Sequence, residues 1–168
     1  MQTHIFNDLE GIRIAVEMER RGRDFYGAAA RLSHGEEMKA LLNALRLEED
    51  AHMGQFQRLY ERERARASGG QVYSAETSAY LTAVAADVVF SEGLVAVGVK
   101  GGFQEPQVML AEGIRSEQQS IDFYRALSEA ARDERTAAIF REILEQEQMH
   151  LERLKNQLEK YSAGFPKG

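Results

Sequence analysis

Two Glu-x-x-His motifs occur in the chain, 98 residues apart, and each has a further glutamate 30 residues upstream. Carboxylates and imidazoles are ligands for iron, manganese and zinc. Two copies of this set supply four carboxylates, which balance the charge of two divalent ions and leave the imidazoles neutral. The chemistry that these residues predict is a dinuclear metal site. The predicted ligands are Glu19, Glu49, His52, Glu117, Glu147 and His150.

The predicted ligands lie within long helical patterns of apolar residues. Apolar side chains recur in steps of three and four over about 5–31, 36–67, 106–132 and 134–161. This spacing places them on one face of each helix, as in a packed bundle. The glutamates and histidines occupy positions in the same apolar faces, so we expect all six to point into the bundle.

The turn signals agree with the ligand spacing. Residues equidistant from the turn of an antiparallel helix pair lie at the same height. The midpoint of the first glutamate pair is position 34, within Ser33-His34-Gly35-Glu36, which we predict to form a capping box for the second helix. The midpoint of the second pair is position 132, beside Asp133, a predicted helix cap. At 1.5 Å rise per residue, each glutamate lies about 20 Å from its turn, near mid-bundle.

These patterns predict an all-α fold, a four-helix bundle in a single domain over 1–168. Two helix hairpins, at about 5–67 and 106–161, are joined by a crossover at about 69–105. The crossover is rich in apolar residues, and we expect it to be helical and to pack on the bundle. It returns the chain along the bundle, so the predicted helix order is up-down-down-up.

Composition excludes several classes of site and partner. The chain has no cysteine, which excludes disulfides, thiolate zinc sites and iron–sulfur clusters within it. Its net charge of −6 argues against nucleic-acid binding. The longest apolar stretch, 83–90, is too short to span a membrane. No signal peptide is recognisable, and we expect a cytoplasmic protein.

The alternative to a metal site is a set of buried ion pairs. An unpaired buried carboxylate costs several kcal/mol, so four of them need compensating cations. Arginine could supply these cations, and Arg23 falls on the apolar face of the first helix. Tyr26 and Tyr124 each follow a predicted glutamate ligand by seven residues, or two helical turns. Their hydroxyls can bond metal-bound carboxylates or take a redox role, or the rings can simply pack in the core.

One glutamate from each of two helices, with Glu-x-x-His from the other two, resembles the ferritin-like dimetal carboxylate bundles. The Phe-Tyr pairs that end at Tyr26 and Tyr124 make the pattern most similar to the rubrerythrin branch. The resemblance covers about 5–65 and 106–160. It implies that Glu49 and Glu147 bridge two irons and that the other four ligands each bind one.

The resemblance also implies an activity and partners. The expected function is that of a di-iron oxidoreductase that reduces hydrogen peroxide or dioxygen, with manganese or zinc as possible substitutes for iron. Because the cysteines of a rubredoxin-like domain are missing, an external protein must donate electrons. A homodimer is expected. The alternatives are a ferroxidase that stores iron in a cage and a non-catalytic metal-binding protein.

Two positions depart from related patterns. Ser120 stands where rubrerythrins usually carry an additional carboxylate, three residues after the third-helix glutamate. Asp50 stands where bacterioferritin, which has a similar ligand set, has its haem-binding methionine.

Overall fold

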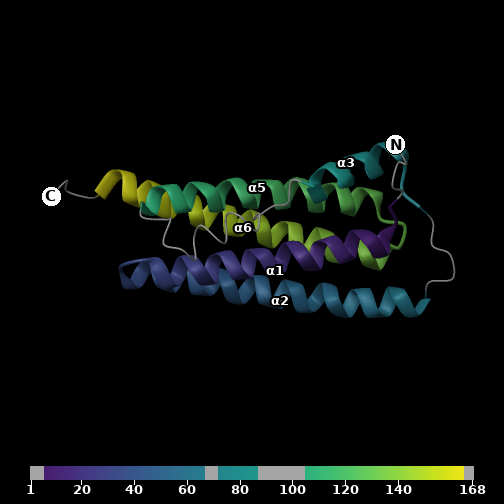
Figure 1. The fold of residues 1–168 in the computed structure, drawn as a ribbon, viewed down its shortest axis with the longest axis horizontal. Helices are drawn as coiled ribbons and strands as arrows, with labels where there is room; N and C mark the ends of the chain where they lie inside the picture. Colours follow the sequence, from purple (N-terminus) through teal and green to yellow (C-terminus); the bar gives the residue numbers. More distant parts are fainter. Residues whose placement is uncertain (1–5, 67–71, 87–104, 165–168) are drawn as a thin grey trace.

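A computed structural model of the chain describes residues 6–66, 72–86 and 105–164. Figure 1 shows two long helix pairs lying side by side, with a shorter helix, α3, alongside α5. The described residues form no strand beyond one isolated bridge between Asn7 and Val72. The predicted all-α, ferritin-like bundle is confirmed. The helices are α1 (Asp8–Leu32), α2 (Glu36–Arg66), α3 (Ala75–Ala86), α5 (Pro106–Ala130) and α6 (Glu134–Gly164).

Contacts at the two ends of the bundle establish the helix order. At one end, Ser33 in the α1–α2 turn lies against Met109 at the start of α5, with its Oγ 3.7 Å from the sulfur. At the other end, the carboxylate of Asp8 at the start of α1 accepts the backbone N–H groups of Arg132 and Asp133 in the α5–α6 turn. The chain therefore runs up-down-down-up, as the sequence predicts (Figure 1).

Of the predicted crossover at 69–105, the structure describes residues 72–86 and 105; 69–71 and 87–104 lie outside the described residues. Its described part is tied to the start of α1. The backbone N–H of Tyr73 donates to the carbonyl of Phe6 at 2.7 Å, and the backbone N–H of Phe6 donates to Ser78 Oγ at 3.0 Å. No helix in the described ranges combines the length and apolarity that crossing a membrane requires.

The apolar faces that the sequence pattern predicts meet in one core. An aromatic layer within it joins three helices, with the ring of Phe56 from α2 centred 5.5 Å from Tyr124 and 5.6 Å from Phe140. All three are fully buried. Burying a side chain of this size contributes about 1.5–3 kcal/mol. This layer fixes α2, α5 and α6 relative to one another beside the predicted ligands.

One predicted cap is confirmed and one is wrong. Asp133 caps α6, since its Oδ2 accepts the backbone N–H of Thr136 at 3.0 Å. Ser33, in contrast, does not open α2. Its hydroxyl donates to the carbonyl of Ala29 at 2.8 Å and so ends α1. Gly35 follows with a φ of 92°, a left-handed conformation that reverses the chain and separates Ser33 from the first turn of α2.

Candidate metal centre

The six predicted ligands converge from four helices at the middle of the bundle. Each is at most 2 % exposed. They form two overlapping groups, within each of which one candidate ligand atom per residue lies within 4.8 Å of all the others. The groups are Glu19, Glu49, His52 and Glu147, and Glu49, Glu117, Glu147 and His150. Glu49 and Glu147 belong to both groups, so these two carboxylates lie between two candidate metal positions.

The helix geometry explains this convergence. Glu49 and His52 are three residues apart on α2, so they project from the same face, and the same spacing holds on α6. Contacts then cross between the two hairpins. His52 Nδ1 lies 3.1 Å from Glu147 Oε1, and His150 Nδ1 lies 3.2 Å from Glu49 Oε1. Each imidazole is therefore placed beside the carboxylate of the opposite hairpin as well as that of its own.

The outer nitrogen of each imidazole is held by a polar side chain. His150 Nε2 donates to Glu48 Oε2 at 2.7 Å, and His52 Nε2 donates to Gln146 Oε1 at 2.8 Å. Both partner oxygens are acceptors, so Nε2 carries a hydrogen in each ring. The inner nitrogen, Nδ1, faces the glutamates. This is the arrangement of a metal-binding histidine whose second nitrogen fixes the ring orientation.

The two predicted tyrosines bond glutamates of the opposite hairpin. The hydroxyl of Tyr26 on α1 donates to Glu117 Oε1 on α5, and that of Tyr124 on α5 donates to Glu19 Oε1 on α1. Both rings are fully buried. Burial, followed by the neighbouring glutamate charges, raises the pKa of both phenols, so they remain protonated donors. Each hydroxyl thus occupies one oxygen of a glutamate and leaves the other directed inward.

The four carboxylates divide into two kinds by their pKa values. Burial, followed by the charges of Glu49 and Glu147, raises the pKa of Glu19 and of Glu117 well above the usual 4.5. Burial also acts to raise the pKa of Glu49 and Glu147. For these two, hydrogen bonds from the neighbouring glutamates and the imidazoles outweigh burial, and the net shift of both is downward. The central pair therefore ionises first.

The imidazoles supply the balancing positive charge in the metal-free protein. Burial acts to lower the pKa of His52 and of His150, since it disfavours the charged form. Hydrogen bonds to the surrounding glutamates outweigh burial and raise both pKa values well above 6.5. Protons on the imidazoles thus supply positive charge in the region where metal ions would otherwise supply it.

Several inward-facing atoms indicate whether the site fits a metal. Glu49 Oε1, Glu117 Oε2, Glu147 Oε1 and His150 Nδ1 are buried, and none of them makes a hydrogen bond of good geometry with another described residue. The inner imidazole nitrogens lie 3.1 and 3.2 Å from glutamate oxygens, but three of these contact atoms are still among those without a well-directed hydrogen bond. Such orphaned polar atoms are uncommon in protein interiors. All four are of ligand type and belong to the same cluster. Divalent cations at its centre would satisfy them together, so these residues fit a dinuclear metal centre.

Arg23 does not take part in the cluster. Its guanidinium is partly exposed and lies 2.9 Å from Asp24 and 3.4 Å from Asp50. It also contacts the sulfur of Met53. These contacts hold it at the surface between α1 and α2. Within the described ranges, the buried glutamates have no arginine partner, so the alternative of buried arginine ion pairs is not supported.

A model of the rubrerythrin family matches residues 109–164 of the chain. This span contains most of α5 and all of α6, and with them Glu117, Glu147 and His150. This part of the chain is similar to rubrerythrins. Comparisons with curated proteins and with solved structures gave no match. The α1–α2 hairpin, which lies outside the matched span, carries the other three candidate ligands with the same spacing.

Sequence reasoning missed the residues that hold the outer imidazole nitrogens. Glu48 and Gln146 each directly precede a predicted glutamate ligand, and they are themselves 98 residues apart. The two predicted ligand sets are related by the same offset of 98 residues, and this was the signal in the sequence that could have identified the pair. Neither residue lies in the apolar face of its helix, however, and a contact to the opposite hairpin follows only from how α2 and α6 pack.

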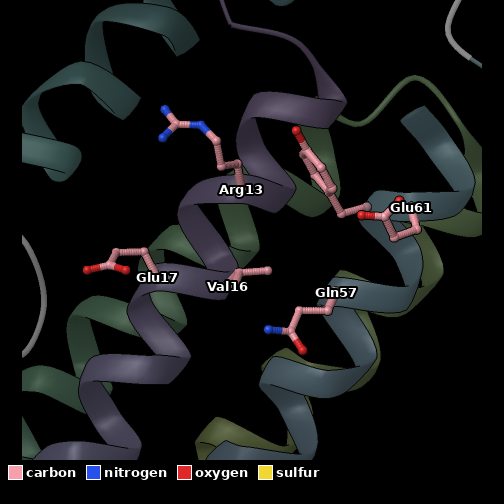
Figure 2. Close-up of a pocket in the computed structure, with 6 residues that line it drawn as sticks. Arg13, Val16, Glu17, Gln57 and Glu61 are labelled. Carbon is pink, nitrogen blue, oxygen red and sulfur yellow. The ribbon is translucent and has the colours of Figure 1, made fainter. Parts of the chain in front are cut away.

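A surface cleft lies apart from the candidate centre. It has a volume of about 420 Å³ and is lined by residues of α1 and α2 (Figure 2). In Figure 2, Val16 and Gln57 flank the space between the two helices, and Glu17 points away from α2. None of the six candidate ligands lines this cleft. The cleft is therefore separate from the candidate metal centre.

Proposed function

We propose that the protein is a di-iron oxidoreductase that reduces hydrogen peroxide or dioxygen at the buried glutamate–histidine cluster. The observation that carries the proposal is the pair of overlapping ligand groups that share Glu49 and Glu147. One group alone would suit a single ion. Two groups with shared carboxylates suit two ions close together, and the rubrerythrin-like match supports iron as the metal.

The role of each residue follows from its position. Glu49 and Glu147 would contact both ions, since they belong to both groups. Glu19 and His52 would hold one ion, and Glu117 and His150 the other. When bound, the two irons supply the electrons that reduce an O–O bond. Carboxylates suit this chemistry because they are anionic oxygen ligands that can change between bridging and terminal binding.

The tyrosines and the surrounding core have a supporting role. Tyr26 and Tyr124 each hold one oxygen of a terminal glutamate, which fixes the carboxylate and directs its other oxygen toward the ions. The buried rings of Phe56 and Phe140 lie against Tyr124 and keep water from this side of the centre. We assign the tyrosines as positioning residues, because their hydroxyls touch ligands and not the metal positions themselves.

The proposal includes a protein that donates electrons from outside the chain. No cysteine is present to bind a rubredoxin-type iron, so the chain itself offers no thiolate centre for electron transfer. Each catalytic cycle that leaves the metals oxidised needs two electrons from such a donor. A homodimer in the cytoplasm remains part of this proposal.

The experiment is anaerobic loading with Fe(II), followed by rapid mixing with peroxide or with dioxygen. We expect two irons to bind per chain and to be oxidised rapidly after mixing. The oxidant that reacts faster is identified as the substrate. Glu147→Ala serves as the control that lacks a shared ligand. If wild-type protein binds two irons and neither oxidant reacts faster than with Glu147→Ala, the enzymatic proposal is wrong. A particle mass of many subunits with retained iron would indicate storage instead.

A further inference from the structure

The residues that hold the two imidazoles differ in charge although they occupy equivalent positions. Glu48 and Gln146 are 98 residues apart, the same offset that relates the two ligand sets. Glu48 accepts from His150 Nε2 at 2.7 Å, and Gln146 accepts from His52 Nε2 at 2.8 Å. The geometry is nearly the same on both sides. One histidine thus donates to a carboxylate and the other to a neutral amide.

An arginine adds to this difference on one side only. Arg153 Nη1 lies 2.9 and 2.8 Å from the two oxygens of Glu48. The position 98 residues before Arg153 is Gln55, which carries no charge. Both side chains of the ion pair are more than a third exposed, so solvent screens their attraction. Arg153 therefore mainly holds the Glu48 carboxylate in position beside the imidazole and neutralises little of its charge.

The acceptor of an imidazole N–H affects the opposite nitrogen of the ring. A carboxylate draws the Nε2 hydrogen more strongly than an amide does, because charge-assisted hydrogen bonds are roughly twice as strong as neutral ones. The ring becomes more electron-rich, and Nδ1 becomes a more basic metal ligand. Changes to such partners alter metal affinity by roughly 10–100-fold.

We propose that Glu48 makes the two metal positions unequal, so that the position of His150 binds its ion more tightly and fills first. This inference rests on the proposed metal centre. Glu48 is a positioning residue here: it touches a ligand and not the metal. The position of His52, held by the neutral Gln146, fills second.

The test is a titration of the metal-free full-length protein with Co(II), which reports binding through its visible absorption. Wild-type protein should bind two ions in a tight and a weak step. Glu48→Gln should weaken the tight step about tenfold and leave the weak step in place. Gln146→Glu should strengthen the weak step. The double variant Glu48→Gln/Gln146→Glu exchanges the two partners and should again show two separated steps.

Glu145→Gln is the matched control. It removes a carboxylate from an exposed position on α6, next to Gln146, and should leave both steps unchanged. Circular dichroism of each metal-free variant checks the fold. The inference is overturned if Glu48→Gln leaves both steps unchanged or weakens them equally, or if Gln146→Glu has no effect while the protein binds two ions. If wild-type protein binds no pair of Co(II) ions, the proposed metal centre itself is wrong.

Discussion

Removing the metal should destabilise the protein more at pH 8 than at pH 5. Four groups of the metal-free cluster have raised pKa values: the carboxyls of Glu19 and Glu117 and the imidazoles of His52 and His150. A group with a raised pKa holds its proton in the folded protein after the unfolded chain has released it. Its stabilising effect is complete below the unfolded pKa and is lost as pH rises toward the folded value.

The part of this loss that comes from the two histidines can be bounded. Each group that keeps a proton which the unfolded chain has lost lowers the free energy of unfolding by about 1.4 kcal/mol per pH unit. The unfolded imidazoles lose theirs above the ordinary pKa of 6.5, whereas the folded ones retain them. Between pH 6.5 and pH 8, two such groups sum to roughly 4 kcal/mol at most. For a chain of this length, that corresponds to roughly 10 °C in Tm.

The other carboxyls of the cluster do not reverse this loss of stability with rising pH. Glu19 and Glu117 add to the loss from pH 4.5 upward, since their folded pKa values are also raised. Glu49 and Glu147, whose pKa values are lowered, are mostly ionised in both states between pH 5 and pH 8 and contribute only a small opposite slope near pH 5. Bound metals displace the protons, so the metal-loaded protein escapes the loss and gains the binding energy as well.

The assay is thermal unfolding of metal-free and Mn(II)-loaded protein at pH 5, 6.5 and 8. The difference in Tm between the two forms should widen with pH. The metal-free double variant Glu19→Gln/Glu117→Gln serves as the control, because it replaces two of the four proton-holding groups with amides and should show a shallower pH dependence. A difference in Tm that stays constant or narrows with pH would refute the reasoning, since it would mean that the four groups do not hold protons together in a dry core.

Three further outcomes follow from the site and the caps. Glu147→Ala should lose both metals, whereas His52→Ala should weaken the binding of one metal, as measured by metal-to-protein ratios. If Glu147→Ala retained two ions, Glu147 would not be a shared ligand. Tyr124→Phe should lower the free energy of unfolding by about 1.5–3 kcal/mol in urea titrations, because it removes a hydrogen bond to the buried Glu19. Asp133→Ala should cost about 1 kcal/mol in the same titrations and leave metal content unchanged, since it removes only the α6 cap.

The fold and the six clustered residues could be predicted from the sequence because they depend on local periodicity. Steps of three and four residues determine which face of each helix is buried. The 30-residue spacing between the glutamates of each hairpin places the two at the same height along the bundle. Glu49 and His52, for example, must share a face whatever the packing of the other helices. Two hairpins with apolar faces can bury them only against each other, which brings the two halves of the cluster together.

What could not be predicted depends on packing between the hairpins. The sequence places Tyr26 two turns from Glu19, but the hydroxyl bonds Glu117 on another helix. The partners Glu48 and Gln146 are found only from the way α2 lies against α6. The capping box at Ser33 fails for a different reason. The same residue can end one helix or begin the next, and the left-handed Gly35 decides between the two.

The charges of the cluster explain how one apolar core could accept both a metal-free and a metal-loaded state. Without metal, the shifted pKa values favour protons on Glu19, Glu117 and both imidazoles, so that two positive imidazoles balance the ionised Glu49 and Glu147. Two divalent ions with four ionised glutamates and two neutral imidazoles give the same total of zero. Binding of such a pair would therefore exchange four protons for two metals without a change in buried charge. An apolar bundle can hold such a cluster because neither state leaves an uncompensated ion inside it.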